Sequence, residues 1–240
     1  MLTFFQKIID AVLPPRCIKC GKILNGEPGL CPECFNRIDF ISKPYCSKCG
    51  IPFEKAERSD NLLCGKCIKE KRSPFRMNRS AMRYDDNSKN LVLSFKFMDR
   101  TENASVLAKW MKIAGEDIWK EGVDVLVPVP LHYTRLIKRK YNQSALLCAE
   151  LSKLTGIPVN YNSVVRHLKT RPQVEFSGKE RIKNIKGAFC IRHPEQIQGK
   201  RVVLVDDVMT TGSTLKECAS VIKKAGAASV DTLTAARVCK

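Results

Sequence analysis

The chain changes its hydrophobic pattern near position 75. Beyond that point, short apolar runs alternate with longer helix-like segments. Strands are predicted at residues 124–130, 161–165, 202–206 and 229–235. Helices are predicted at residues 88–98, 102–119, 142–155 and 213–225. Strands that alternate with helices are typical of an α/β fold, in which helices cover both faces of a parallel or mostly parallel sheet.

The segment before position 75 is of a different kind, so we expect two domains, at 1–75 and 76–240. Eight of the twelve cysteines fall there, in four C-x-x-C pairs: Cys17/Cys20, Cys31/Cys34, Cys46/Cys49 and Cys64/Cys67. Two such pairs complete a tetrahedral four-cysteine zinc site. We therefore predict two structural Zn²⁺ sites in a module with too few large apolar side chains to fold without metal.

The pairing of these cysteines is open at this point. Pairing in sequence order gives one site from residues 17–34 and another from 46–67, although the spacing also allows an interleaved arrangement. A disulfide framework is the alternative, but it requires export, because cytosolic thiols stay reduced. The other four cysteines lie mostly in apolar patterns and are interpreted as small buried hydrophobic residues: Cys148, Cys190, Cys218 and Cys239.

The N-terminal segment MLTFFQKIIDAVLPPRC gives no export signal. It lacks a basic start, its apolar run is broken by Gln6, Lys7 and Asp10, and Pro14-Pro15 ends it. Its apolar residues share one helical face, which favours a short docking helix: Leu2, Phe5, Ile9, Val12 and Leu13. No run approaches the ~20 apolar residues that span a bilayer. We expect a cytoplasmic protein without a membrane span.

The stretch VVLVDDVMTTGST at 202–214 carries the main chemical signal. An apolar strand delivers Asp206 and Asp207 to the sheet edge where ligands bind in such folds, and a hydroxyl-rich turn then opens a helix. Free N–H groups at a helix start bind anions. A Walker A loop is absent, and a receiver-type aspartate pocket would not need this turn. A ligand with a diol at one end and a phosphate at the other, such as ribose 5-phosphate, suits both halves.

This stretch resembles the phosphoribosyl pyrophosphate (PRPP) motif of type I phosphoribosyltransferases over its whole length. The resemblance implies that Asp206 and Asp207 hold the ribose 2′ and 3′ hydroxyls. It also implies a 5′-phosphate site at Thr210, Thr211, Gly212, Ser213 and Thr214. Mg²⁺ normally accompanies the diphosphate of PRPP, mainly through the ligand and water, so no all-protein magnesium cage is expected.

Two further segments narrow the resemblance to the ComF competence family. VPVPLHYTRLIKRKYNQSALLCAEL is similar to that family's PVPL…R…R-x-[FY]-N-Q segment, and RHLKTRPQVEFSGKERIKNIKGAF to its R…R-x-Q…R…N…G-A-F segment. The cysteine pairs and SFKFMDR around Lys96 also agree. The resemblance implies a type I phosphoribosyltransferase-like domain joined to a small N-terminal double zinc ribbon. One departure is Lys140, where the family usually has glycine.

The 42 basic and 24 acidic residues give a formal charge of +18, which favours polyanionic partners. Much of the excess lies between 131 and 186, at RLIKRK and at Arg166, Arg171 and Arg181. A basic run is often only a solvated face. Here it follows the strand end that forms the pyrophosphate loop in type I transferases. The resemblance therefore makes four residues candidates for stabilising the leaving diphosphate: Arg135, Arg139, Lys96 and Arg171.

Two hypotheses follow. In one, a ComF-type enzyme transfers phosphoribose from PRPP to an unidentified acceptor. A purine is disfavoured, since Thr210 stands where oxopurine salvage enzymes place an aspartate. In the other, a non-catalytic PRPP sensor or single-stranded-DNA-binding competence factor serves DNA uptake with the competence machinery, with Tyr141 or Phe176 stacking bases. The histidines are interpreted as surface or supporting residues, with His132 the best candidate for a role: His132, His167 and His193.

Overall fold

The computed structural model describes residues 14–54, 61–70, 73–97, 101–168 and 185–239 of the 240-residue chain. The predicted docking helix at the N-terminus therefore lies outside the described residues, as do Arg171, Phe176 and Arg181. No helix in the described part of the chain is long and apolar enough to cross a membrane.

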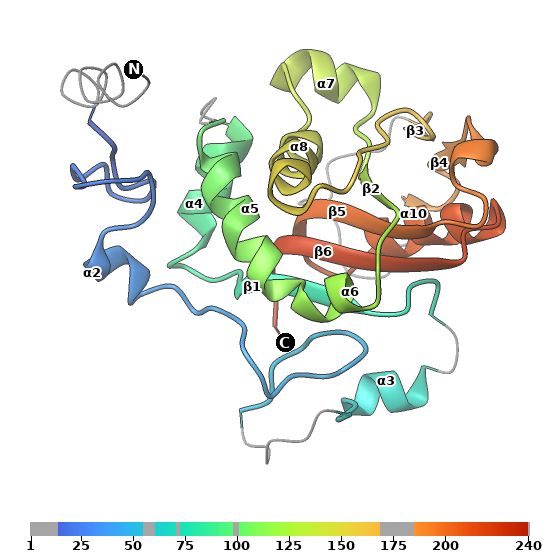
Figure 1. Ribbon diagram of the computed structural model, residues 1–240, viewed down its shortest axis with the longest axis horizontal. Coiled ribbons are helices and arrows are strands. Elements are labelled where there is room, and N and C mark those ends of the chain that lie inside the picture. The colour runs from blue at the N-terminus through green and yellow to red at the C-terminus, as the bar shows by residue number, and fades with distance from the viewer. Residues whose placement is uncertain (1–13, 55–60, 71–72, 98–100, 169–184, 240) are drawn as a thin grey trace.

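A four-stranded parallel sheet forms the centre of the larger module, in the order β1-β6-β5-β2 (Figure 1). The strands are β1 (Asn78–Arg83), β2 (Val125–Pro128), β5 (Arg201–Met209) and β6 (Ser229–Arg237). Alternate residues of β5 point to opposite faces, so Val203 and Val205 enter one core cluster and Val202 and Leu204 the other. The predicted parallel sheet is confirmed.

Helices cover both faces of this sheet, as predicted. One face carries α4 (Lys89–Phe97), α5 (Asn103–Ala114) and α8 (Gln143–Thr155), and the other carries α10 (Ser213–Lys224) (Figure 1). The inward face of α10 is the predicted one, with four buried residues: Leu215, Cys218, Ala219 and Ile222.

Several elements differ from the sequence prediction. The expected helix at 102–119 is two helices, α5 and α6 (Glu116–Lys120), which meet at Gly115. A Cβ on Gly115 would stand 2.8 Å from the Trp119 ring. The strand expected at 161–165 is β3 (Val164–Arg166), which pairs antiparallel with β4 (Phe189–Ile191) outside the main sheet. β1, β4, α7 (Tyr133–Arg139) and the short 3₁₀ turn η2 (Pro194–Gln196) were not predicted.

Two cysteine-rich ribbons precede the sheet. We call residues 14–35, with α2 (Pro32–Phe35), the first ribbon, and residues 46–54 and 61–70, with α3 (Gly65–Lys69), the second ribbon. The segment between them runs along the open edge of β1. There the Ile41 N–H donates to the Ala81 carbonyl (2.9 Å), and the Arg83 N–H donates to the Asp39 carbonyl (2.8 Å). These bonds cover backbone groups that an edge strand would otherwise expose.

Candidate functional site

A cleft of about 870 Å³ opens at the carboxyl ends of β2 and β5, where ligands bind in open parallel sheets. Its walls come from the β5–α10 turn, α7, the start of α8 and the end of α4. Nine predicted site residues line it: Lys96, Arg135, Arg139, Asp206, Asp207, Thr210, Gly212, Ser213 and Thr214. Thr211 lies in the same turn. All the residues that were predicted to contact PRPP and that the structure describes therefore lie around this one cleft.

Asp206 follows the four buried residues 202–205 of β5 and has a polar setting. Its Oδ1 accepts hydrogen bonds from Ser144 Oγ at the start of α8 (2.9 Å) and from the backbone N–H of Asp207 (2.9 Å). Burial first, and the charge of Asp207 second, raise the pKa of Asp206 to about 7. This carboxyl group therefore titrates near neutral pH, so both its protonated and its ionised forms are present there to contact a hydroxyl ligand.

Asp207 is almost fully buried and is partnered by a lysine from another element. Its Oδ1 accepts from the backbone N–H of Val208 (2.6 Å) and forms an ion pair with Lys96 Nζ (3.1 Å). Lys96 was predicted to stand near a leaving diphosphate, and the structure places its ammonium group on the acidic pair. Asp207 thus has a cationic partner before any ligand binds.

The turn after β5 has the form of an anion site. Gly212 has φ of +74°, a left-handed conformation that glycine adopts without strain, and α10 begins at the next residue. The hydroxyls of Thr211 and Ser213 lie 2.8 Å apart, and Thr211 Oγ1 accepts from the Ser213 N–H (3.4 Å). The first N–H groups of a twelve-residue helix therefore face the cleft beside hydroxyl groups.

The segment Tyr141-Asn142-Gln143-Ser144 holds the end of α4 against this site. Tyr141 Oη donates to the Phe95 carbonyl (3.0 Å), and Gln143 Nε2 donates to the Lys96 carbonyl (3.2 Å). These bonds cap the last turn of α4 and fix the backbone that carries Lys96. The Tyr141 hydroxyl therefore has a structural role at the end of α4. This hydrogen bond was not predicted from the sequence.

Three arginines stand around the same cleft. Arg135 and Arg139 come from α7, and Arg166, which sequence reasoning did not select, comes from the end of β3. Burial first, and the charge of Arg135 second, lower the pKa of Arg166 to about 10. Its guanidinium lies 5.5 Å from the ring centroid of Phe189 on the paired strand. One feature of the sequence could have identified Arg166 as a cleft residue, namely its position at the end of a predicted strand within the basic stretch.

One interpretation from the sequence was wrong and another was confirmed in part. His132, predicted to be a surface or supporting residue, is 5% exposed and so not on the surface, but it supports the start of α7, where its Nδ1 accepts from the Thr134 N–H (3.4 Å). Cys190, taken as buried, is exposed, and Cys239 is only partly buried, whereas Cys148 and Cys218 are buried as predicted.

The ribbons bring the eight predicted cysteines into two tetrads, paired in sequence order. Within the described residues, the Sγ atoms of Cys17, Cys20, Cys31 and Cys34 lie within 4.8 Å of one another, as do those of Cys46, Cys49, Cys64 and Cys67. This spacing fits four thiolates around one Zn²⁺ ion. The interleaved arrangement is excluded.

The thiols of each tetrad differ in acidity in a way that suits a metal. Burial acts to raise the pKa of Cys17, but backbone N–H groups, first that of Cys31, outweigh it and lower the pKa to about 6. Burial and the neighbouring thiols raise the pKa of Cys34 to about 12. Four thiolates therefore do not coexist without a cation, and a divalent ion removes the repulsion.

Comparison with known proteins agrees with both halves of this description. Residues 8–70 match the double zinc ribbon domain, and residues 141–238 match the phosphoribosyl transferase domain. The chain is 34% identical over 218 residues to competence protein F of Haemophilus influenzae, covering 88% of this chain and 92% of that protein. The chain belongs to the competence protein F (ComF) family.

Another ComF relative is the DNA utilization protein YhgH of Escherichia coli K12, 33% identical over 223 residues, or 91% of this chain and 95% of that protein. Among solved structures, the glutamine PRPP amidotransferase of Bacillus subtilis matches with a TM-score of 0.40 and 18% identity. That match covers 63% of this chain and 33% of the other. A likeness of this level carries no argument about function.

The departure from the ComF pattern at Lys140 has a structural meaning. Lys140 ends α7 with φ of +65°, and it alone among the described residues other than glycine has positive φ. Glycine adopts this conformation without the Cβ clash that costs other residues about 1–2 kcal/mol. The family's usual glycine is thus explained by backbone geometry, and lysine in this chain adds a cation to the cleft wall at some cost in strain.

Proposed function

We propose that this ComF-family chain binds PRPP in the cleft between β2 and β5 and transfers its phosphoribosyl group to an acceptor. The observation that carries the proposal is the junction of β5 and α10. There an acidic pair, of which Asp207 is buried, precedes a hydroxyl-rich helix start within one cleft of about 870 Å³. A diol at one end and a phosphate at the other match these two groups in order.

The acidic pair would accept hydrogen bonds from the ribose 2′ and 3′ hydroxyls. Asp207 is paired with Lys96 Nζ at 3.1 Å, while burial and the charge of Asp207 raise the pKa of Asp206 to about 7. Hydroxyl donors favour the ionised form of Asp206, so binding should strengthen as the pH rises through 7. The turn from Thr210 to Thr214 would hold the 5′-phosphate with backbone N–H groups and hydroxyls.

Mg²⁺ is part of this proposal as a companion of the diphosphate. Asp207 is already paired with Lys96, so the acidic residues of the cleft do not offer a complete set of metal ligands. When bound, the metal would neutralise charge that develops on the diphosphate. Arg135 and Arg139 line the wall after β2 and would take the remaining charge.

The proposed reaction breaks the bond between ribose C1 and the diphosphate oxygen and forms a bond from C1 to the acceptor. Inorganic pyrophosphate leaves with the bonding electron pair, and the acceptor nucleophile loses its proton. The acceptor is unidentified, and a non-catalytic PRPP sensor is the alternative form of the same site.

The test is calorimetric titration of PRPP with Mg²⁺ into wild type and into Asp206→Asn/Asp207→Asn. Asp86→Asn serves as a control, because that carboxylate is exposed and its partner in the described part of the chain is Lys89 on α4. We expect wild type and control to bind and the double variant to lose at least about a hundredfold in affinity. Equal affinity in all three proteins would refute the site. Pyrophosphate release with added candidate acceptors then separates an enzyme from a sensor.

A second candidate function is single-stranded DNA binding in DNA uptake, together with competence partners. It is favoured by α7, which exposes Tyr133 (67%) and Ile137 (76%) beside the cations Lys138 and Arg139. Bases stack on such aromatic groups while cations follow the backbone. It also draws on the names of the relatives, a competence protein and a DNA utilization protein. Such a role, like reduced zinc-binding thiols, agrees with the expected cytoplasmic location.

Fluorescence titration of a labelled single strand tests this second function. Wild type should bind with an affinity that falls steeply with salt, and Arg135→Ala/Arg139→Ala or Tyr133→Ala should weaken it. Binding that is absent, or unchanged in both variants, removes α7 as the DNA surface.

A further inference from the structure

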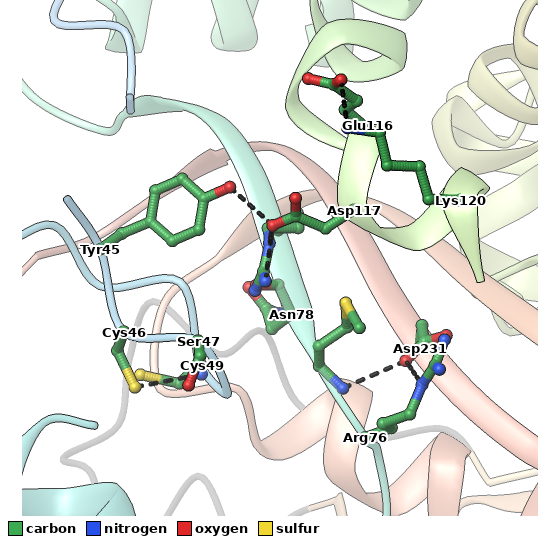
Figure 2. A network of polar contacts seen from close by, with 12 residues as sticks. Tyr45, Cys46, Ser47, Cys49, Arg76, Asn78, Glu116, Asp117, Lys120 and Asp231 are labelled. Carbon is green, nitrogen blue, oxygen red and sulfur yellow. Dashed lines mark hydrogen bonds and ion pairs between the residues drawn. The ribbon is translucent and has the colours of Figure 1, made fainter. Parts of the chain in front are cut away.

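The second ribbon touches the sheet close to the proposed phosphate turn. Asn78, the first residue of β1, donates its backbone N–H to the carbonyl of Lys48 (2.8 Å), which lies between Cys46 and Cys49. Figure 2 shows Asn78 together with Cys46 and Cys49. A Cβ on Gly50 would overlap the Asn78 carbonyl oxygen, so the cysteine turn packs directly against the backbone of β1.

The side chain of Asn78 continues this connection toward the cleft. It is fully buried, and its Nδ2 donates to Thr232 Oγ1 (2.6 Å) and contacts Met209 Sδ (3.0 Å). Met209 lines the cleft, and its Sδ and Cε lie 3.7 and 3.6 Å from the point where a Cβ on Gly212 would stand. Asn78 therefore joins the second cysteine turn to the residue that supports the proposed phosphate turn.

A second connection runs between the same two regions. Glu70 at the end of α3 forms an ion pair with Lys216 of α10, and its carbonyl accepts from Lys48 Nζ (3.1 Å). The N–H of Lys216 bonds the Gly212 carbonyl (2.8 Å), so this lysine belongs to the first turn of α10. The second ribbon thus holds both the strand before the phosphate turn and the helix after it.

The first ribbon has no such contacts among the described residues. Its links to the larger module include the side chains of Ile18 and Leu30, which pack into the core on the α5 side, and an ion pair of Glu27 with Lys109 of α5. None of these reaches a residue of the cleft.

We propose that Asn78 is a positioning residue through which the second tetrad, when it holds its metal, sets Met209 and the phosphate turn. The affinity of the cleft for a phosphate-bearing ligand then depends on metal at Cys46, Cys49, Cys64 and Cys67. It does not depend on metal in the first tetrad. A bound ion fixes the turn that presents the Lys48 carbonyl, and its loss releases Asn78 and favours other positions of Met209. The inference rests on the proposed function in one respect, the identity of the ligand as PRPP.

The first arm of the test removes metal from one tetrad at a time. Cys64→His and Cys20→His each weaken one tetrad while keeping a ligand, so a mild chelator can strip the altered site first, with zinc release followed by a colorimetric indicator. The full chain carries ¹³C-labelled methionine methyl groups, and the Met209 signal is assigned with Met209→Leu. Stripping Cys64→His should shift the Met209 signal and weaken PRPP binding about tenfold. Stripping Cys20→His should change neither.

The second arm keeps both metals in place. Asn78→Asp has the same shape but lacks the donor to Met209 and Thr232. It should bind full zinc, shift the Met209 signal and weaken both PRPP and inorganic phosphate about fivefold to tenfold. If it only lowers the melting temperature while the Met209 signal and the affinities stay as in wild type, Asn78 is merely structural and the inference is wrong.

The outcomes of the two arms remain separable. A Met209 signal that ignores stripping of the second tetrad, or responds equally to the first, overturns the coupling even if PRPP binds. A Met209 signal that responds as expected in a protein that fails to bind PRPP upholds the coupling and refutes the proposed ligand.

Discussion

The two ribbons repeat one local motif in two different surroundings. In each, a C-x-x-C turn is followed by a left-handed glycine, Gly21 with φ of +77° and Gly50 with φ of +67°, and a second cysteine pair completes the tetrad. A Cβ on Gly21 would meet nothing within 4 Å, whereas one on Gly50 would overlap β1.

The same metal motif therefore serves two structural purposes in this chain. The first ribbon is attached to the α5 side of the core by apolar packing and one exposed ion pair. The second is attached by directional contacts: the Lys48 carbonyl accepts from the Asn78 N–H, the Cys49 carbonyl accepts from Arg237, and Glu70 forms an ion pair with Lys216. Hydrogen bonds depend on distance and angle and so fix the relative position of two groups, whereas apolar packing is non-directional and mainly keeps them close.

The largest expected effect is common to both ribbons. Removal of metal from wild type by prolonged chelation should unfold both, because a structural zinc supplies about 10–16 kcal/mol in small peptides and these ribbons bury few large apolar side chains. Hydrogen exchange should show loss of amide protection in 14–54 and 61–70 while β5 and β6 stay protected. If the first ribbon keeps its protection, its contact with the core suffices to fold it, and the two ribbons differ more than the structure implies.

A matched pair of glycine variants tests the difference in surroundings. Gly21→Ala and Gly50→Ala share the left-handed penalty of about 1–2 kcal/mol, but only Gly50→Ala adds an overlap with β1. Gly50→Ala should therefore lower the free energy of unfolding by about 1–3 kcal/mol more than Gly21→Ala. Denaturant titration of the zinc-loaded proteins measures this, and equal losses would contradict the close packing of the second ribbon.

A change inside the cleft should leave both ribbons as they are. Folding raises the pKa of Asp206 to about 7, so the folded state favours the protonated carboxyl, and stability is lost as the pH rises from about 4 to 7. Asp206→Asn resembles the protonated form. It should raise the free energy of unfolding by about 1–2 kcal/mol at pH 8, with the gain vanishing near pH 4, and keep full zinc content. An unchanged or lower stability at pH 8 would show that Asp206 is not strained by burial.

The smallest expected effects come from the ion pairs that attach each ribbon. Glu70→Gln removes the partner of Lys216 and should weaken PRPP binding about twofold to threefold. Glu27→Gln removes the exposed partner of Lys109 and should leave the affinity within error of wild type. Parallel calorimetric titrations measure both. Equal effects would mean that attachment of either ribbon, and not the specific path through α10, matters to the cleft.

Much of this structure is readable from short stretches of sequence. The apolar run before Asp206 and the turn that follows predict a strand, a helix and the site between them, because the chemistry is local to thirteen residues. The tetrads follow from C-x-x-C spacing for the same reason. The position of Lys96 cannot be predicted in this way, because it depends on hydrogen bonds that Tyr141 and Gln143 donate to the end of α4.

The missed elements share a cause. β1 has the sequence NRSAMR, which is typical of a polar linker, yet its polar side chains are buried against partners far along the chain, Ser80 on Thr234 and Arg79 on Asp117. Arg166 is buried only because β3 pairs with β4. Such partners become visible only once the chain is folded, so hydrophobic periodicity cannot reveal these residues.

The proposed sugar-phosphate site can be examined in a crystal of the zinc-loaded protein soaked with PRPP and Mg²⁺. We expect density for the sugar phosphate across the β5–α10 junction, with the two ribose hydroxyls at hydrogen-bond distance, about 2.7 Å, from the carboxylates of Asp206 and Asp207. The 5′-phosphate should lie against the backbone of Thr211 to Thr214. A cleft that stays empty at a saturating concentration, or a ligand seated away from the acidic pair, would contradict the proposed site.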